Sequence, residues 1–164
     1  MGKNLVELFG TEPELVFFDF DGVLSKYQTM ESSVGIYPES DWVRWCIEVD
    51  DVFKHGGPSK TMKEVVSTLG TNRVAVLSVA ETSFEQKQKL EFLKEHYPEF
   101  DENAVYFVAK SEYKKMVIQS IYNKHYKYKC HESKIFVVED SLSVIEDIES
   151  NSKFKCKHIS YFMD

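Results

Sequence analysis

Residues 15–25 read Leu15-Val16-Phe17-Phe18-Asp19-Phe20-Asp21-Gly22-Val23-Leu24-Ser25, an almost continuous apolar run that ends in two aspartates and a glycine. Hydrophobicity that is continuous rather than alternating is typical of a parallel strand covered by helices on both faces. Gly22 lets the chain turn immediately after the second aspartate. This stretch therefore predicts a buried strand whose carboxyl end carries Asp19 and Asp21.

Further β-rich runs alternate with segments of helical periodicity along the chain. The expected strands are 73–78, 104–108, 134–138 and a weaker 157–160, and the expected helices are 61–69, 83–97, 111–126 and 141–150. Gly70 fits a helix C-cap. This alternation predicts an α/β fold, a doubly wound parallel sheet with right-handed crossovers.

The composition bounds the class of protein. The 164 residues fit a single domain, and the formal net charge of −7 disfavours a bulk electrostatic grip on nucleic acid. Cys46, Cys130 and Cys156 are scattered and form no CxxC, which indicates reduced thiols. No apolar run approaches the roughly 18 residues of a membrane span, and no secretory signal is evident. We expect a soluble cytoplasmic protein that does not bind membranes.

One segment breaks the alternation. Residues 27–58 hold no obvious strand, and 41–53 has the pattern of an amphipathic helix with Trp42 and Trp45 on one stripe. We expect a small lid inserted over the carboxyl end of the first strand. Burial of the lid helix on the sheet explains the two tryptophans better than stacking on a base does.

Charged and polar residues follow the expected strands. In open parallel sheets, ligands bind outside the carboxyl ends of the strands. Asp19 and Asp21 end the first strand, Ser78 ends the second, and Glu139 and Asp140 end the fourth. Paired carboxylates favour a hard cation such as Mg²⁺, and a serine hydroxyl can donate to a phosphoryl oxygen. Each feature also has a plain structural interpretation, as a turn or a helix cap.

Three lysines gather near the start of the expected helix 111–126, namely Lys110, Lys114 and Lys115. The helix macrodipole disfavours cations at this end, so the cluster suggests an anion nearby. A solvated helix face explains one or two of these lysines equally well.

Taken in this order, the four strand ends resemble those of the haloacid dehalogenase-like (HAD) hydrolases. The resemblance covers nearly the whole chain and is carried by Phe17-Phe18-Asp19-Phe20-Asp21-Gly22-Val23-Leu24-Ser25, Val76-Leu77-Ser78, a lysine at the head of 111–126, and Val137-Val138-Glu139-Asp140-Ser141. It implies one HAD-like domain over 1–164, a Rossmann-like three-layer sandwich with a parallel sheet, and Mg²⁺-dependent phosphoryl transfer through an aspartyl-phosphate.

The resemblance also implies roles for single residues. Asp19 is expected to be the nucleophile, and Asp21 the general acid and then the general base. An acid at the second position resembles the phosphatases of the family and argues against dehalogenation. Ser78 and a lysine are expected to hold the phosphoryl oxygens.

Two further assignments follow from the resemblance. Mg²⁺ is expected on the Asp19 carboxylate, the Asp21 backbone carbonyl and Asp140, with Glu139 nearby as a ligand or through water. The family places apolar residues about four and seven positions after its lysine, which favours Lys114 over Lys110 and Lys115.

The expected function is therefore hydrolysis of a phosphomonoester by a nearly capless phosphatase. An open site suits a phosphoprotein or a nucleic-acid end, and a lid or a second subunit would suit a nucleotide or small metabolite. A phosphotransferase and a non-catalytic phosphate- or Mg²⁺-binding module are the alternatives. The substrate and the oligomeric state stay open.

Overall fold

A single parallel sheet organises the molecule. The structure is a computed structural model that describes residues 4–26 and 57–163. Its sheet has five strands in the order β3-β2-β1-β4-β5, and all neighbouring pairs are parallel. The strands are β1 Leu15–Phe18, β2 Val74–Val79, β3 Val105–Val108, β4 Ile135–Glu139 and β5 Lys155–His158. This confirms the predicted α/β fold, because the order is that of a doubly wound, Rossmann-like sheet.

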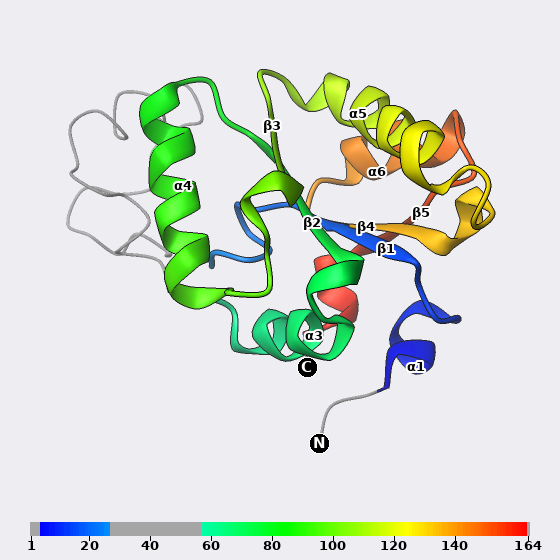
Figure 1. The fold of residues 1–164 in the computed structure, drawn as a ribbon, viewed down its shortest axis with the longest axis horizontal. Coiled ribbons are helices and arrows are strands. Elements are labelled where there is room, and N and C mark those ends of the chain that lie inside the picture. Colours follow the sequence, from blue (N-terminus) through cyan, green and yellow to red (C-terminus); the bar gives the residue numbers. More distant parts are fainter. Residues whose placement is uncertain (1–3, 27–56, 164) are drawn as a thin grey trace.

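Helices cover both faces of this sheet and make three layers (Figure 1). The layer on one face contains α1 Leu5–Phe9, α3 Lys60–Leu69 and α4 Ser83–His96, and the layer on the other contains α5 Lys114–Ile121 and α6 Leu142–Ser150. No helix in the described part of the chain has the length and the apolar composition that a bilayer crossing requires.

Alternate residues of each strand enter two separate hydrophobic cores. Val16 and Phe18 of β1 lie in the core shared with α1, α3 and α4, whereas Leu15 and Phe17 lie in the core shared with α5 and α6. All four residues are buried, which explains the unbroken apolar run. Because side chains alternate along a strand, the next odd-numbered residue, Asp19, faces α5 and α6.

The last expected strand is wrong in its bounds. It was placed at 157–160, but β5 spans Lys155–His158 and Ile159 begins a short 3₁₀ turn. β5 is an edge strand that pairs only with β4. Edge strands commonly carry charged side chains, so the apolar pattern marks such a strand poorly.

Two helical segments also differ from the prediction. The expected helix 111–126 is a 3₁₀ turn at Ser111–Tyr113, then α5, then a π-helical turn at Tyr122–Tyr126. Helix α1 was not predicted, although its signal is present. The Asn4 side chain accepts from the Glu7 N–H while the Glu7 side chain accepts from the Asn4 N–H, which is a capping box.

The predicted lid helix at 41–53, with Trp42 and Trp45, lies outside the described residues, as does Cys46. The described ends of the inserted segment are held together. The Lys26 N–H donates to the Gly57 carbonyl over 3.0 Å, and Ser25 forms a β-bridge with Pro58. Residues 25–26 and 57–58 therefore lie side by side.

The two described cysteines, Cys130 and Cys156, are free thiols. Burial raises the pKa of Cys156 to about 12, and it also raises the pKa of Cys130 above its ordinary value. Both thiols are therefore protonated at neutral pH and are poor nucleophiles.

Tyr97 ties α4 to the chain on either side of the insertion. Its ring is fully buried, and its hydroxyl donates to the Leu24 carbonyl over 2.5 Å and accepts from the Ser59 N–H over 3.1 Å. Leu24 follows β1, and the Ser59 side chain caps α3. One hydroxyl therefore fixes the ends of three segments.

We expect Tyr97→Phe to lower the free energy of unfolding by about 0.5–1.5 kcal/mol, the usual net value of one hydrogen bond. The loss stays moderate because the Ser59 N–H also reaches the Leu24 carbonyl, at 3.1 Å. Urea denaturation measures it. Tyr128→Phe is the control, since Tyr128 is 94% exposed. Equal effects of the two substitutions would contradict the assigned role of Tyr97.

Candidate active site

The candidate site lies where β1, β2 and β4 end. Asp19 follows β1 directly, and its N–H donates to the Val138 carbonyl over 3.0 Å, so it continues the β1–β4 ladder. Glu139, the last residue of β4, is therefore its neighbour across the sheet. Both side chains are odd-numbered in their strands and face the layer of α5 and α6.

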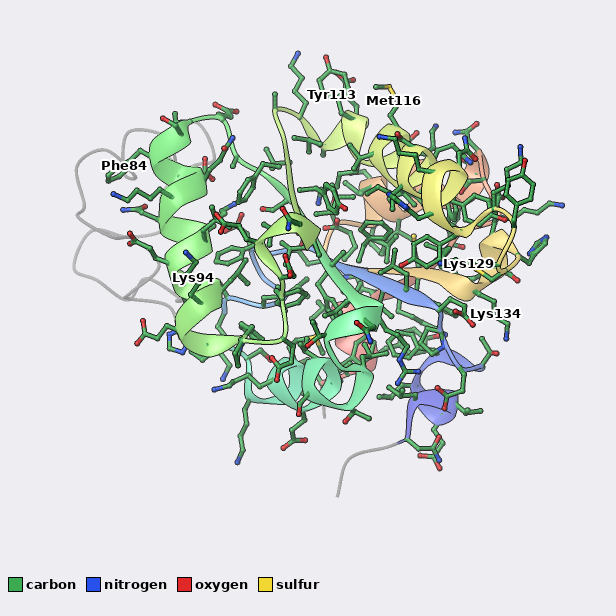
Figure 2. The ribbon with its side chains drawn as sticks, in the orientation of Figure 1. Phe84, Lys94, Tyr113, Met116, Lys129 and Lys134 are labelled. Atoms are coloured by element: carbon green, nitrogen blue, oxygen red, sulfur yellow. The ribbon has the colours of Figure 1, made fainter. Side chains whose placement is uncertain are left out.

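Lys114, the first residue of α5, forms ion pairs with both carboxylates. Its Nζ donates to Asp19 Oδ1 over 3.1 Å and to Glu139 Oε2 over 2.8 Å. The neighbouring side chains of Tyr113 and Met116 lie exposed on the outside of the helix (Figure 2), whereas Lys114 is only 3% exposed. The lysine at the candidate nucleophile is therefore Lys114.

The other two lysines of the cluster lie elsewhere. Lys110 is exposed to solvent. Lys115 pairs with Asp147 of α6, with 3.5 Å between the charged atoms. These two lysines match the interpretation as a solvated helix face.

Glu139 is engaged at both carboxylate oxygens. Oε2 accepts from Lys114, and Oε1 accepts from the N–H groups of Asp140 and Ser141 over 3.1 and 3.3 Å. Ser141 stands at the N-cap position of α6 without a side-chain capping bond. Glu139 thus orients both Lys114 and the turn that carries Asp140.

Three carboxylates could hold a metal ion. Oxygens of Asp19, Glu139 and Asp140 lie within 4.8 Å of one another. Hard oxygen donors of this kind fit Mg²⁺, and a single lysine leaves the group with excess negative charge. Both oxygens of Glu139 already accept hydrogen bonds from Lys114 and the backbone, which makes Glu139 a weaker candidate ligand. The carboxylate of Asp21 is not part of this group among the described residues.

A second lysine, Lys89 of α4, stands on the other side of the site. Its side chain is completely buried, and Nζ donates to Asp21 Oδ2 over 2.7 Å and to Ser78 Oγ over 2.9 Å. It also donates to the Val79 carbonyl over 2.8 Å and lies 3.3 Å from Glu85. The ion pair with Asp21 joins residues 68 positions apart in the chain.

Sequence reasoning missed Lys89. It lies in a helix rich in Glu, Gln and Lys, where one more lysine attracts no attention. The available signal was helical spacing. Lys89 precedes the buried Phe92 and Leu93 by three and four positions, so all three share the buried face of α4.

The two lysines approach the site from opposite faces of the sheet. Ser78 has the same parity as Val74 and Val76 of β2, which face α4. Phe20 lies in the same core, and the Lys89 ammonium stands 5.1 Å from the centre of its ring. The ammonium that binds Asp21 and Ser78 therefore comes from α4, and the ammonium that binds Asp19 comes from α5.

Burial governs the ionisation of these groups. It raises the pKa of Asp19 to about 6, although the nearby Lys114 ammonium lowers it. Burial also raises the pKa of Asp21 above its ordinary value, against the opposite pull of Lys89. Burial lowers the pKa of Lys114, but Asp19 and Glu139 outweigh this effect and raise it. Both aspartates are therefore easier to protonate than exposed ones.

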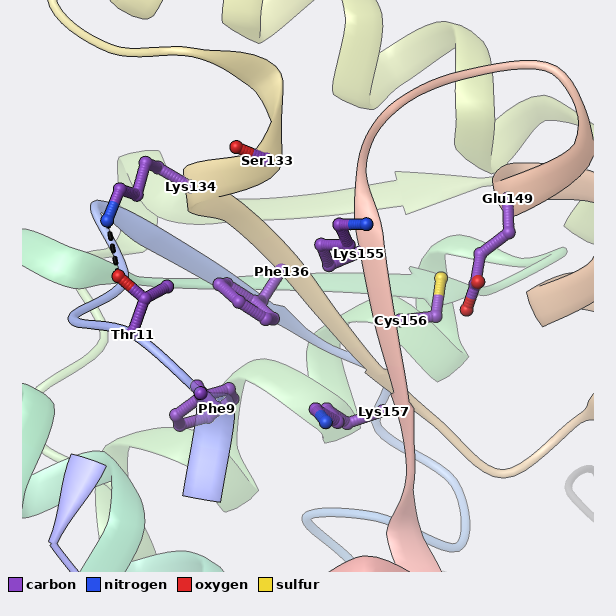
Figure 3. Close-up of a pocket in the computed structure, with 10 residues that line it drawn as sticks. Phe9, Thr11, Ser133, Lys134, Phe136, Glu149, Lys155, Cys156 and Lys157 are labelled. Atoms are coloured by element: carbon purple, nitrogen blue, oxygen red, sulfur yellow. Dashed lines mark hydrogen bonds between the residues drawn. The ribbon is translucent and has the colours of Figure 1, made fainter. Parts of the chain in front are cut away.

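A separate hollow of about 470 Å³ lies at the amino-terminal ends of β4 and β5, away from these carboxylates. Figure 3 shows Lys134, Lys155 and Lys157 around it, with Phe136 at its base and a hydrogen bond from Lys134 to Thr11. Lysines on an exposed edge strand are a common protection against unwanted pairing. The hollow holds none of the predicted site residues.

Comparison with known proteins found two similar solved structures. No family model matches the sequence, and no curated protein matches it. The solved HAD domain of effector protein Lem4 from Legionella pneumophila is similar, with 14% identity, a TM-score of 0.48, and coverage of 89% of this chain and 84% of that chain. Its inactive mutant is similar at 13% identity and TM-score 0.48, covering 90% and 84%.

The raised pKa of Asp19 predicts that this carboxylate destabilises the metal-free protein. Between about pH 4 and about pH 6 the folded state holds the proton more tightly than the unfolded chain, so stability falls as pH rises through this window. We expect Asp19→Asn to be more stable than wild type by about 1–3 kcal/mol near pH 7.5 and equal to it near pH 4. Urea denaturation at both pH values measures this.

Mg²⁺ is expected to stabilise the wild type more than Asp19→Asn at neutral pH, because binding to the folded state favours it. Asp147→Asn is the control, since an exposed ion pair contributes little to stability. If Asp19→Asn is less stable than wild type at neutral pH without metal, the ionised Asp19 is not a source of instability.

Proposed function

We propose that this chain is a HAD-type, Mg²⁺-dependent phosphohydrolase that acts on a phosphomonoester through an aspartyl-phosphate on Asp19. One observation carries the proposal: two aspartates two positions apart are held by two different buried lysines. A binding module would need neither the second aspartate nor its separate lysine. A nucleophile and an acid need distinct surroundings, because they do different chemistry.

Asp19 is oriented for attack on phosphorus. Its Oδ1 accepts from Lys114 and from the Phe20 N–H, the latter over 2.8 Å. These two bonds fix the carboxylate plane, and Oδ2 is the oxygen that would form the bond to phosphorus. Holding a nucleophile in one orientation lowers the entropic part of the barrier.

Asp21 is suited to proton transfer. Lys89 binds its Oδ2, and no hydrogen bond within the described part of the chain engages Oδ1. Asp21 gives its proton to the oxygen that leaves phosphorus, and later takes a proton from the water that attacks phospho-Asp19. A raised pKa favours the protonated form that the first step requires.

The phosphoryl oxygens find two donors in the chain. Within the described part of the chain, Lys114 uses two of its three N–H groups, on Asp19 and Glu139, and the third could donate to a phosphoryl oxygen. The Ser78 hydroxyl is the second donor. Mg²⁺, held by Asp19, Asp140 and the Asp21 backbone carbonyl with Glu139 beside them, would supply further positive charge to these oxygens.

The substrate class stays broad. A phosphoprotein, a nucleic-acid end, a nucleotide and a small phosphorylated metabolite all carry the required monoester. A phosphotransferase would use the same groups with another acceptor in place of water. Comparison of released phosphate with phosphorylated acceptor separates the two activities.

We expect the purified protein to hydrolyse p-nitrophenyl phosphate with Mg²⁺ and to lose this activity with a chelator. Asp19→Asn is expected to abolish turnover, because the amide cannot form the acyl-phosphate. Asp21→Asn is expected to lower kcat by about 10²–10⁴-fold while Mg²⁺ binding, followed by calorimetry, is kept. No Mg²⁺-dependent turnover in the wild type would sink the proposal, and full activity of Asp21→Asn would remove that residue from proton transfer.

The three lysines of the cluster allow a matched comparison. Lys114→Met is expected to lower kcat/KM by at least about 10²-fold, since it removes a buried charge from the site of reaction. Lys110→Met and Lys115→Met make the same change near the same helix end, and their kcat/KM values are expected to stay within about threefold of wild type. A large loss of kcat/KM in either of these two variants, with a small loss in Lys114→Met, would contradict the assignment of this role to Lys114.

A further inference from the structure

We infer that Lys89 is a positioning residue that aligns Asp21 and Ser78 for the leaving-group step. This inference rests on the proposed function, because it concerns the residue proposed as the acid. Lys89 reaches the site from α4, on the face of the sheet opposite to α5. Lys89 and Lys114 therefore lie on different helices in different layers of the fold.

The contacts of Lys89 point to positioning rather than to substrate binding. Its ammonium has three N–H groups, and it lies within hydrogen-bonding reach of Asp21, Ser78 and the Val79 carbonyl, with Glu85 close by. No N–H group is left for a phosphoryl oxygen. Lys114 differs in this respect, because two of its three donors are engaged by the described residues.

Lys89 also sets the direction of the Ser78 hydroxyl. Ser78 Oγ accepts from Lys89, so its own proton must point away from the ammonium. Within residues 4–26 and 57–163, that proton has a single acceptor, the carbonyl of the adjacent Val79 at 3.3 Å. A phosphoryl oxygen at the site would be a better acceptor. One ammonium thus aligns a proton donor to the leaving oxygen and a donor to the transferred group.

A packing role alone does not account for this lysine. Burying an ammonium is expensive, and an apolar chain of the same length would fill the space beside Phe20 without that cost. Glu85, one turn earlier on α4, holds Lys89 from its own helix, and the Glu81 N–H in turn holds Glu85 over 3.2 Å. Glu85 therefore helps to hold the Lys89 ammonium in the position where it binds Asp21.

The test compares kcat/KM on p-nitrophenyl phosphate and phenyl phosphate, whose leaving groups have the same ring but differ in their need for a proton. Nitrophenolate leaves readily without an acid, and phenolate does so poorly. With Mg²⁺, Lys89→Met in the full chain is expected to lose about 10²-fold on phenyl phosphate and less than about tenfold on p-nitrophenyl phosphate. A purely structural role would lower both values by the same factor.

Two comparisons sharpen the result. Lys94→Met makes the same change on the exposed side of α4 (Figure 2) and is expected to keep both kcat/KM values within about twofold. Lys89→Met combined with Asp21→Asn is expected to lose little more than Asp21→Asn alone, because residues that act as a unit are not additive. Additive losses, or equal losses on the two substrates, would overturn the inference.

Removal of Lys89 leaves Asp21 and Glu85 without their shared cation, so the variant is checked by circular dichroism and thermal unfolding. If Lys89→Met does not fold, Lys89→Met with Glu85→Gln removes one of the two carboxylates and is assayed in its place against Glu85→Gln. Absence of wild-type turnover would overturn the proposed function and this inference together. Wild-type turnover without a leaving-group effect in the variant would overturn this inference alone.

Discussion

Burial of negative charge at one end of the sheet is the constraint on which the site depends. Asp19, Glu139 and Glu85 are almost completely buried, and Asp21 is three-quarters buried, because helices cover both faces of the sheet up to its carboxyl end. Carboxylates in such surroundings need a counter-charge or a proton. The fold supplies two lysines from opposite layers, and the excess of carboxylates over lysines leaves a place for a divalent cation.

The pleat of the strands and the turn that follows β1 divide these carboxylates between two environments. Asp19 and Glu139 continue the odd-numbered positions that face α5, where Lys114 binds both. Ser78 continues the positions that face α4, where Lys89 binds it together with Asp21. Asp21 would face α5 like Asp19 if the strand continued, but β1 ends at Phe18 and the chain turns at Phe20. This turn gives two aspartates only two residues apart different lysine partners.

The same arrangement places an ionised carboxylate where it is expected to lower the stability of the folded protein. An ionised Asp19 is held in surroundings that favour its protonated form, which raises its pKa to about 6. Active sites commonly keep such unfavourable groups, and the rest of the structure compensates. Here the compensation comes from two well-packed cores and from Tyr97, whose hydroxyl joins the segments on either side of the inserted residues. Rigid surroundings keep the charged groups in place.

The sequence by itself determined the strand–helix alternation, the parallel sheet and the polar strand ends, because continuous apolar runs and short-range motifs are local properties. The preference for Lys114 came from the family resemblance, which places apolar positions after its lysine. The place of Lys89 in the site was evident only from the tertiary structure, since its pairing with Asp21 spans 68 positions. In the sequence, Lys89 looks like any other lysine of a polar helix. The bounds of β5 likewise depended on pairing with β4, because an edge strand that contains two lysines carries only a weak apolar signal. Contacts between distant segments decide which of many similar charges is buried, and only folding brings those segments together.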